Sequence, residues 1–145
     1  MLRDFDGTLG PVPTPTIETL RNVPLFAELD DHALEHIVEL AGEFTARRGQ
    51  LLIERGQPGM GLFLVEDGTV AVEIDGEDPI ELGPGDFFGE LAVLTDHHRT
   101  ARVRAVTEVK TLAIARKDLF DLLEDHPEVA VVMLREVARR LASML

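Results

Sequence analysis

Residues 85–101 read Gly-Asp-Phe-Phe-Gly-Glu-Leu-Ala-Val-Leu-Thr-Asp-His-His-Arg-Thr-Ala and are the most informative part of the sequence. It lies between two strand-like runs, one ending at Leu82 and the other starting at Arg102. The stretch does not have the pattern of a hairpin loop. It opens with glycines, where the backbone turns sharply or approaches a ligand closely, and then continues as an apolar run long enough for one or two helical turns.

A short helix with glycine before it and arginine after it is a physically sensible phosphate site. Backbone N–H groups at the helix start and the helix dipole favour an anion there, and the planar guanidinium of Arg99 suits phosphate oxygens. Glu90 fits such a site only if its carboxylate points away from the phosphate and accepts from a sugar hydroxyl. The alternative is an ion pair between Glu90 and Arg99 that closes a surface loop.

Short strands separated by glycine turns surround this stretch. Residues 70–75 alternate between apolar and polar, as a half-buried strand does, and Asp67-Gly68 in front of them predicts a two-residue hairpin. The predicted strands are 43–47, 50–54, 62–66, 70–75, 79–82, 102–106 and 110–115. Strands of this length and spacing indicate an all-β barrel or sandwich.

Helices are predicted at both ends of the chain. Residues 16–20 form a helical turn, and residues 31–41 form an amphipathic helix with Asp30 or Asp31 as N-cap and Gly42 as the stop signal. Near the other end, residues 117–124 form a helix and a second one starts at Val129. The order is therefore helix, β-barrel, two helices.

The last helix carries an apolar stripe that is too wide for one neighbour. Its members are Ala130, Met133, Leu134, Val137, Ala138, Leu141 and Leu145. One part of the stripe is expected to pack on the barrel, and the other part is available to a partner chain.

Composition restricts the function classes. The chain has 145 residues, enough for one domain, and a formal net charge of −13, which disfavours nucleic acid and anionic membranes as partners. It has no cysteine, which excludes disulfides and thiolate chemistry. Without a signal peptide or a spanning segment, a cytoplasmic location is expected. Asp96-His97-His98 is interpreted as a solvated loop tip, so no metal is expected.

The residues from Phe88 to Ala92, followed by Arg99-Thr100-Ala101 nine positions after Glu90, closely resemble the phosphate-binding cassette of cyclic-nucleotide-binding domains. The resemblance extends over residues 18–145. It implies a mainly β fold: an eight-stranded antiparallel β-roll, jelly-roll-like, with an N-terminal helix, a short cassette helix and two C-terminal helices. Residues 16–145 would be this domain, and residues 1–15, rich in proline and glycine, a flexible arm.

The resemblance implies a ligand-binding role for seven residues. They are Gly89, Glu90, Leu91, Ala92, Arg99, Thr100 and Ala101. In the family pattern Arg99 pairs with the phosphate oxygens, the backbone of Leu91 and Ala92 donates to the phosphate, and Glu90 accepts from the ribose 2′-OH. Gly89 lets the ribose approach closely.

Three positions leave the details open. Thr100 meets either the phosphate or a guanine amino group, so cAMP and cGMP both remain candidates. Arg102 stands where the family more often has a small or hydroxyl residue. Ser143 and Met144 are the nearest candidates for a lid over the base, and the lid is short, supplied by a partner chain, or missing.

The sequence thus predicts a stand-alone cyclic-nucleotide sensor, not an enzyme, with cAMP or cGMP as ligand and no cofactor. Binding would be relayed through the C-terminal helices, hinged near residues 125–127, to a protein effector that the sequence does not identify. The alternative is a ligand-free docking or dimerisation module that uses the C-terminal helix. A third interpretation makes the chain one piece of a larger regulatory protein.

One enzyme motif is also present. Residues 4–9, Asp-Phe-Asp-Gly-Thr-Leu, resemble the nucleophile loop of haloacid-dehalogenase-type phosphatases. In that family the loop follows a buried strand of an α/β fold, for which the chain has no room, so this interpretation is disfavoured.

Overall fold

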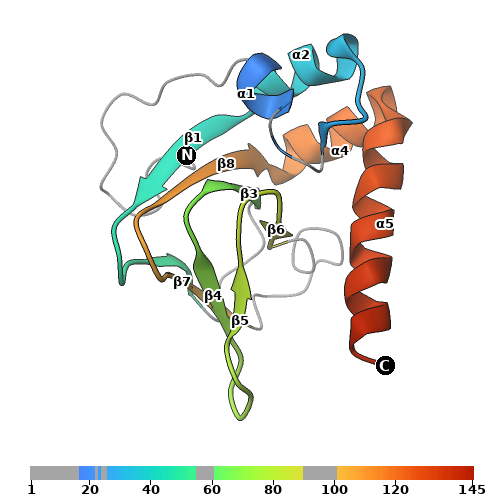
Figure 1. Cartoon of the computed structure of the whole chain (residues 1–145). Helices are drawn as coiled ribbons and strands as arrows, with labels where there is room; N and C mark the ends of the chain where they lie inside the picture. Colours follow the sequence, from blue (N-terminus) through green and yellow to red (C-terminus); the bar gives the residue numbers. More distant parts are fainter. Residues whose placement is uncertain (1–16, 22, 24–25, 55–60, 90–100) are drawn as a thin grey trace.

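The computed structural model describes residues 17–21, 23, 26–54, 61–89 and 101–145, whose strands pair into two four-stranded antiparallel sheets (Figure 1). The first sheet has the order β1 (Gly42–Ala46), β8 (Val109–Ala115), β3 (Gly61–Asp67), β6 (Phe87–Phe88). The second has the order β2 (Leu51–Ile53), β7 (Arg102–Ala105), β4 (Val70–Glu73), β5 (Ile80–Leu82). The mainly β roll with eight antiparallel strands is confirmed.

Four bent chain segments build both sheets. Each strand of the first sheet is joined along the chain to one strand of the second sheet: β1 to β2, β8 to β7, β3 to β4, and β6 to β5. The joined strands occupy the same position in the two sheet orders. The bends are tied together by backbone hydrogen bonds, since Gly49 N donates to Ala105 O at 2.8 Å and Val106 N donates to Thr69 O at 2.9 Å. Each segment therefore runs through one sheet, turns at a shared corner, and continues in the other.

The predicted hairpin at Asp67-Gly68 is wrong. Strands β3 and β4 belong to different sheets, and both pair with the β7–β8 segment instead of with each other. Gly68 has φ +89°, and a Cβ at this position would lie 2.3 Å from the carbonyl oxygen of Glu108. Glycine is needed here because the chain crosses between the sheets against another backbone, not because it forms a tight hairpin.

Four helices complete the described fold: α1 (Ile17–Arg21), α2 (Asp31–Leu40), α4 (Arg116–Asp125) and α5 (Pro127–Ser143). Asp30 is the N-cap of α2, and its side chain accepts from Ala33 N at 2.9 Å. The stop signal assigned to Gly42 is wrong. Helix α2 ends at Leu40 with Ala41 extended, and Gly42 begins β1.

The first sheet is buried on both faces. Its inner face joins a core between the sheets, made of residues such as Phe44, Phe63, Val65, Val70, Phe88 and Val103. Its outer face packs against the helices through residues such as Leu62, Leu64, Phe87, Leu112, Leu119 and Met133. This double burial explains why residues 61–65 are apolar throughout and do not alternate.

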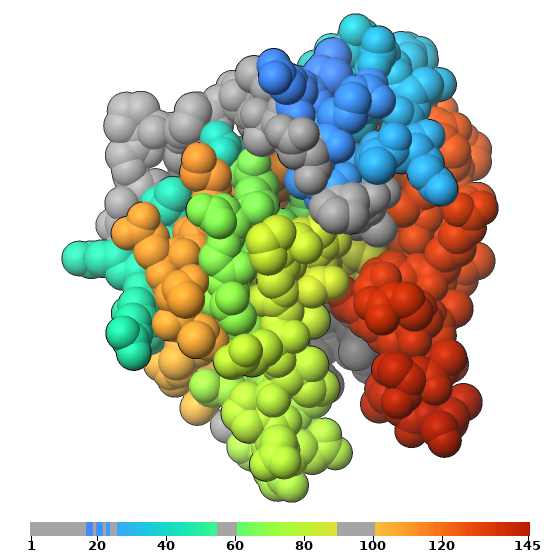
Figure 2. Space-filling view, in the orientation of Figure 1, coloured from blue at the N-terminus to red at the C-terminus, as the bar shows by residue number. Residues whose placement is uncertain are grey.

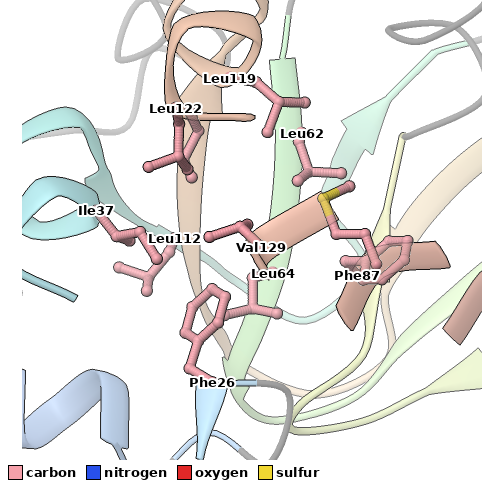
Figure 3. A pocket seen from close by; sticks show the side chains of 11 residues that line it. Phe26, Ile37, Leu62, Leu64, Phe87, Leu112, Leu119, Leu122 and Val129 are labelled. Atoms are coloured by element: carbon pink, nitrogen blue, oxygen red, sulfur yellow. The ribbon is translucent and has the colours of Figure 1, made fainter. Parts of the chain in front are cut away.

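A small apolar cavity of about 20 Å³ remains between the helices and the first sheet (Figure 3). The labelled side chains around it come from α2, α4, α5 and strands β3, β6 and β8, together with Phe26. The cavity is too small for a nucleotide and offers no polar lining. It is a packing gap where three helices meet one sheet.

Helix α5 has two different faces, as the wide stripe predicted. Val129 and Met133 are buried against the roll, and Val132 and Val137 are partly buried beside them. On the other side, Leu134 is 67% exposed and Leu141 is 58% exposed. Among the described residues, every helix is too short or too polar to cross a bilayer.

Two expectations fall outside the described residues. The arm assigned to residues 1–15 and the cassette helix expected after Gly89 both lie there. The division into an arm and a domain of residues 16–145 therefore stays a prediction.

Gly68 and Gly76 both have positive φ, but only Gly68 lies at the shared corner. We therefore expect alanine substitutions at the two positions to differ greatly in their effect on the free energy of unfolding. Gly68→Ala should destabilise the fold by about 3 kcal/mol or prevent folding, because the left-handed backbone costs about 1–2 kcal/mol and the Cβ also meets Glu108. Gly76→Ala has the same backbone cost but nothing within 4 Å of its Cβ, so it should cost only about 1–2 kcal/mol. Urea unfolding of both variants measures the difference, and equal losses would contradict the crossing role.

Candidate functional site

The described part of the predicted cassette consists of its two ends. Gly89 follows β6 in the first sheet, and Ala101 precedes β7 in the second. The segment between them therefore connects the two sheets. Gly89 has φ +90°, the left-handed backbone that favours glycine, so the chain turns sharply as it leaves β6. Ala101 is partly buried.

The other predicted ligand contacts lie outside the described residues. They are Glu90, Leu91, Ala92, Arg99 and Thr100. Their roles stay predictions, and the described residues hold the two ends of the segment that contains them.

Strand β6 is anchored from both sides just before Gly89. Phe88 points into the roll, where its ring stacks on Phe63 with centroids 5.2 Å apart and planes 4° apart. Phe87 is fully buried on the helix side, and the guanidinium of Arg140 in α5 lies 4.4 Å from its ring centroid. The same guanidinium donates from Nη2 to Phe87 O at 2.5 Å. The entry to the cassette is thus fixed both to the core and to the C-terminal helix.

The arginines after Ala101 are already paired with carboxylates. Arg102 Nε donates to Glu54 Oε1 at 2.9 Å, and Arg104 Nε donates to Glu73 Oε2 at 3.2 Å. The hydrogen bond and charge of Glu54 raise the pKa of Arg102 above its ordinary value. Val103 and Ala105, which alternate with them along β7, are buried, so these arginines lie on the outer face of the second sheet. The unusual Arg102 therefore serves a cross-strand ion pair outside the roll.

Comparison with known proteins identifies this architecture. The family model described as "Cyclic nucleotide-binding domain" matches residues 43–126, more than half of the chain. The chain belongs to the cyclic nucleotide-binding domain family. The resemblance found in the sequence is confirmed.

Relatives of this cyclic nucleotide-binding domain include channels and transcriptional regulators. The chain is 36% identical over 118 residues to a cyclic nucleotide-gated potassium channel of Mesorhizobium japonicum, covering 81% of this chain and 33% of the channel. It is 29% identical over 129 residues to a CRP-like cAMP-activated global transcriptional regulator of Mycobacterium tuberculosis, covering 86% of this chain and 58% of the regulator.

A solved structure has a similar fold and length. It is the N-terminal domain of a transcriptional regulator from Streptomyces coelicolor, with 39% identity and a TM-score of 0.66, and the match covers 87% of this chain and 92% of that one. In contrast, the chain covers only 27%, 33% and 21% of the length of the first three curated relatives.

The predicted lid residues lie at the exposed end of α5. Ser143 Oγ donates to Arg140 O at 2.7 Å, and the Met144 residue is 78% exposed. Figure 2 shows the end of α5 standing apart from the β4–β5 hairpin, with a notch in the surface between them. The structure does not place either residue against Gly89 or Ala101, so the lid stays a prediction.

A groove of about 390 Å³ lies between α5 and the β5–β6 turn, but its charges are balanced internally. Arg135 Nη1 donates to Glu28 Oε2 at 3.1 Å, and Arg139 donates to Glu136. The hydrogen bond from Arg139 lowers the pKa of Glu136, and Arg140 contributes to the same shift. The groove does not present a surplus of positive charge for a phosphate. Nor do the described residues hold a cluster of three or more His, Cys, Asp or Glu suited to a metal ion.

Sequence reasoning missed β6 and the role of Arg140. A two-residue strand gives almost no periodic signal, and its residues lay inside the stretch assigned to the cassette. Arg140 did leave a signal. It is spaced three and seven positions from Val137 and Met133 along the apolar face of α5, where an arginine needs a partner.

A carboxyl pair lies on the helix side of the first sheet. Glu43 on β1 is 8% exposed, and Lys110 Nζ on β8 lies 4.0 Å from its Oε1. Burial raises the pKa of Glu66 on β3 to about 7, and the neighbouring carboxyl of Glu43 adds to the shift while Lys110 opposes it. The domain therefore keeps a carboxyl that titrates near neutral pH.

This carboxyl predicts how stability depends on pH. The pKa of Glu66 rises from 4.5 in the unfolded chain to about 7 in the folded one, so the folded state holds the proton more tightly and loses stability as the pH rises from 4.5 to 7. Glu66→Gln should abolish this component and stabilise the fold at pH 8 by about 1–2 kcal/mol, allowing for solvent screening. Urea unfolding at pH 5 and pH 8 measures it. Glu77→Gln, in the exposed β4–β5 turn, is the control, and an equal gain there would contradict the assignment.

Proposed function

We propose that this domain is a regulatory sensor that binds cAMP or cGMP through residues 89–101 and passes the binding event to α4 and α5. The observation that carries the proposal is the double anchoring of β6. The strand that enters the cassette contacts the core through Phe88 and the C-terminal helix through Arg140. A ligand that moves the cassette would therefore act on both.

The charges around the predicted ligand contacts agree with a role for Arg99 in holding the phosphate. The chain is strongly acidic, and Arg102 and Arg104 are occupied by Glu54 and Glu73. In this proposal Arg99 holds the phosphate, aided by the backbone of residues 91–92, and Glu90 holds the ribose. Names among the relatives, a cyclic nucleotide-gated channel and a cAMP-activated regulator, support a cyclic nucleotide as the ligand.

Regulation rather than catalysis is part of this proposal. The described strands pair antiparallel throughout, which differs from the α/β fold that the phosphatase-like interpretation of residues 4–9 requires. A cytoplasmic location and the absence of a nucleic-acid partner stay predictions. One relative is named a transcriptional regulator. Binding to nucleic acid therefore has to be tested for any larger protein that contains this domain, as well as for the domain itself.

Calorimetric titration with cAMP and cGMP tests the sensor. Binding should be micromolar or tighter for at least one nucleotide, and Arg99→Ala should weaken it by about 2 kcal/mol or more, because a charge-assisted pair with the phosphate is lost. Arg48→Ala, at the exposed turn between β1 and β2, removes the same charge elsewhere and should leave the affinity unchanged. Flat heat traces up to millimolar concentrations of both nucleotides would defeat the proposal.

A second candidate function is docking or dimerisation through α5. Its exposed apolar residues are spaced alternately by three and four positions, the spacing of a coiled-coil seam. They are Val131, Leu134, Ala138 and Leu141, followed by Leu145 just beyond the helix. The seam lies opposite the face that packs on the roll, so a second copy of the chain could use it without disturbing the core.

Sedimentation equilibrium separates this candidate from the sensor. A docking module should form a dimer with or without nucleotide, and Leu134→Glu should make it monomeric because a charge enters the seam. Thr45→Glu adds the same charge at an exposed position of β1 and should leave the dimer intact. A substitution at Met133 would not serve, because that side chain is buried in the helix core and its loss tests folding. A monomer at all concentrations would rule out a dimer.

A further inference from the structure

Among the described strands, β6 forms the edge of the first sheet and β3 alone pairs with it there. Along the other edge of such a strand, backbone groups have no neighbouring strand to bond. Arg140 supplies a donor to one of them, Phe87 O, from a helix 53 residues away in sequence. The C-terminal helix therefore completes the edge of the sheet at the strand that leads into Gly89.

The contact is specific to arginine. Cζ of the guanidinium lies over the Phe87 ring, 4.4 Å from its centroid, while Nη2 reaches the backbone oxygen of the same residue. Glu136, one turn earlier in α5, holds the other side of the group, with its Oε1 3.4 Å from Arg140 Nε. The Arg140 side chain is 23% exposed, so the contact is partly shielded from water. Lysine would keep the charge but lose the simultaneous stacking and donation.

We infer that Arg140 is a positioning residue that ties the location of α5 to the conformation of the ligand site. This inference rests on the proposed function. Phe87 is two residues before Gly89 and three before the first predicted side-chain contact, Glu90. A change in the backbone at Gly89 moves Phe87 O relative to α5, so Arg140 either follows it or releases it. By thermodynamic linkage, a contact that stabilises one position of α5 then also changes the affinity of the ligand site for nucleotide.

Distance measurements between two spin labels test this tie. The chain has no cysteine, so Thr45→Cys on β1 and Ala138→Cys on α5 provide the only labelling sites, and both positions are exposed. In this doubly labelled protein, cAMP or cGMP should shift the distance distribution. Arg140→Gln should broaden the distribution without nucleotide and abolish the nucleotide-induced shift, because α5 is no longer held at Phe87.

Two variants control the experiment. Arg135→Gln removes another arginine from α5, one that pairs with Glu28 at an exposed site, and should retain both the narrow distribution and the shift. Arg140→Lys should restore part of the shift, since an ammonium still interacts with the Phe87 ring. If Arg140→Gln does not fold, Arg140→Lys and Phe87→Leu are compared with the parent protein instead. Each should reduce the nucleotide-induced shift in the distance distribution.

The outcomes separate this inference from the proposed function. An Arg140→Gln distribution identical to that of the parent protein without nucleotide overturns the positioning role, whether or not nucleotide binds. If calorimetry shows binding and Arg140→Gln keeps the full nucleotide-induced shift, the tie is overturned and the sensor stands. If neither nucleotide binds the parent protein, the sensor fails, and the nucleotide-free comparison still tests whether Arg140 positions α5.

Discussion

The first sheet is buried on both faces, and this double burial determines how the strands, the helices and the ends of the cassette are held. Side chains alternate across a strand, so consecutive residues of this sheet enter different cores. At β6 this places Phe88 between the sheets and Phe87 under the helices, where it meets Arg140. A strand of only two residues is thereby held by both layers of the molecule. The domain needs this anchoring because the chain turns away from the sheet at Gly89.

Charge in this domain is distributed by local pairing despite the large acidic excess. The arginines on the outer face of the second sheet face Glu54 and Glu73, and those of α5 face Glu28 and Glu136. Such pairs add little stability at exposed sites. Their effect is to neutralise the guanidinium groups. Among the described residues, Arg140 is the one charged side chain that binds a backbone carbonyl of β6. It joins the C-terminal helix to the first sheet.

The sequence predicted the elements better than their connections. Apolar periodicity located both long helices near the C-terminus and most strands within a few residues, and the cassette motif identified the family. The pattern at Asp67-Gly68 suggested a hairpin because a positive-φ glycine looks the same in a tight turn and at a crossing between sheets. The difference depends on Glu108, forty residues away, which no local pattern reports. The joint between Arg140 and Phe87 was out of reach for the same reason, since it depends on how two distant segments pack.

The shared corner also determines how the molecule comes apart. Every bent segment belongs to both sheets, so neither sheet is able to unfold while the other stays intact, and the roll should melt as one cooperative unit. The last turn of α5 is different, because Leu141 and Met144 are largely exposed and add little to that core. Fraying beyond Arg140 therefore costs the roll almost nothing, and amide exchange there should be far faster than in β3 or β8.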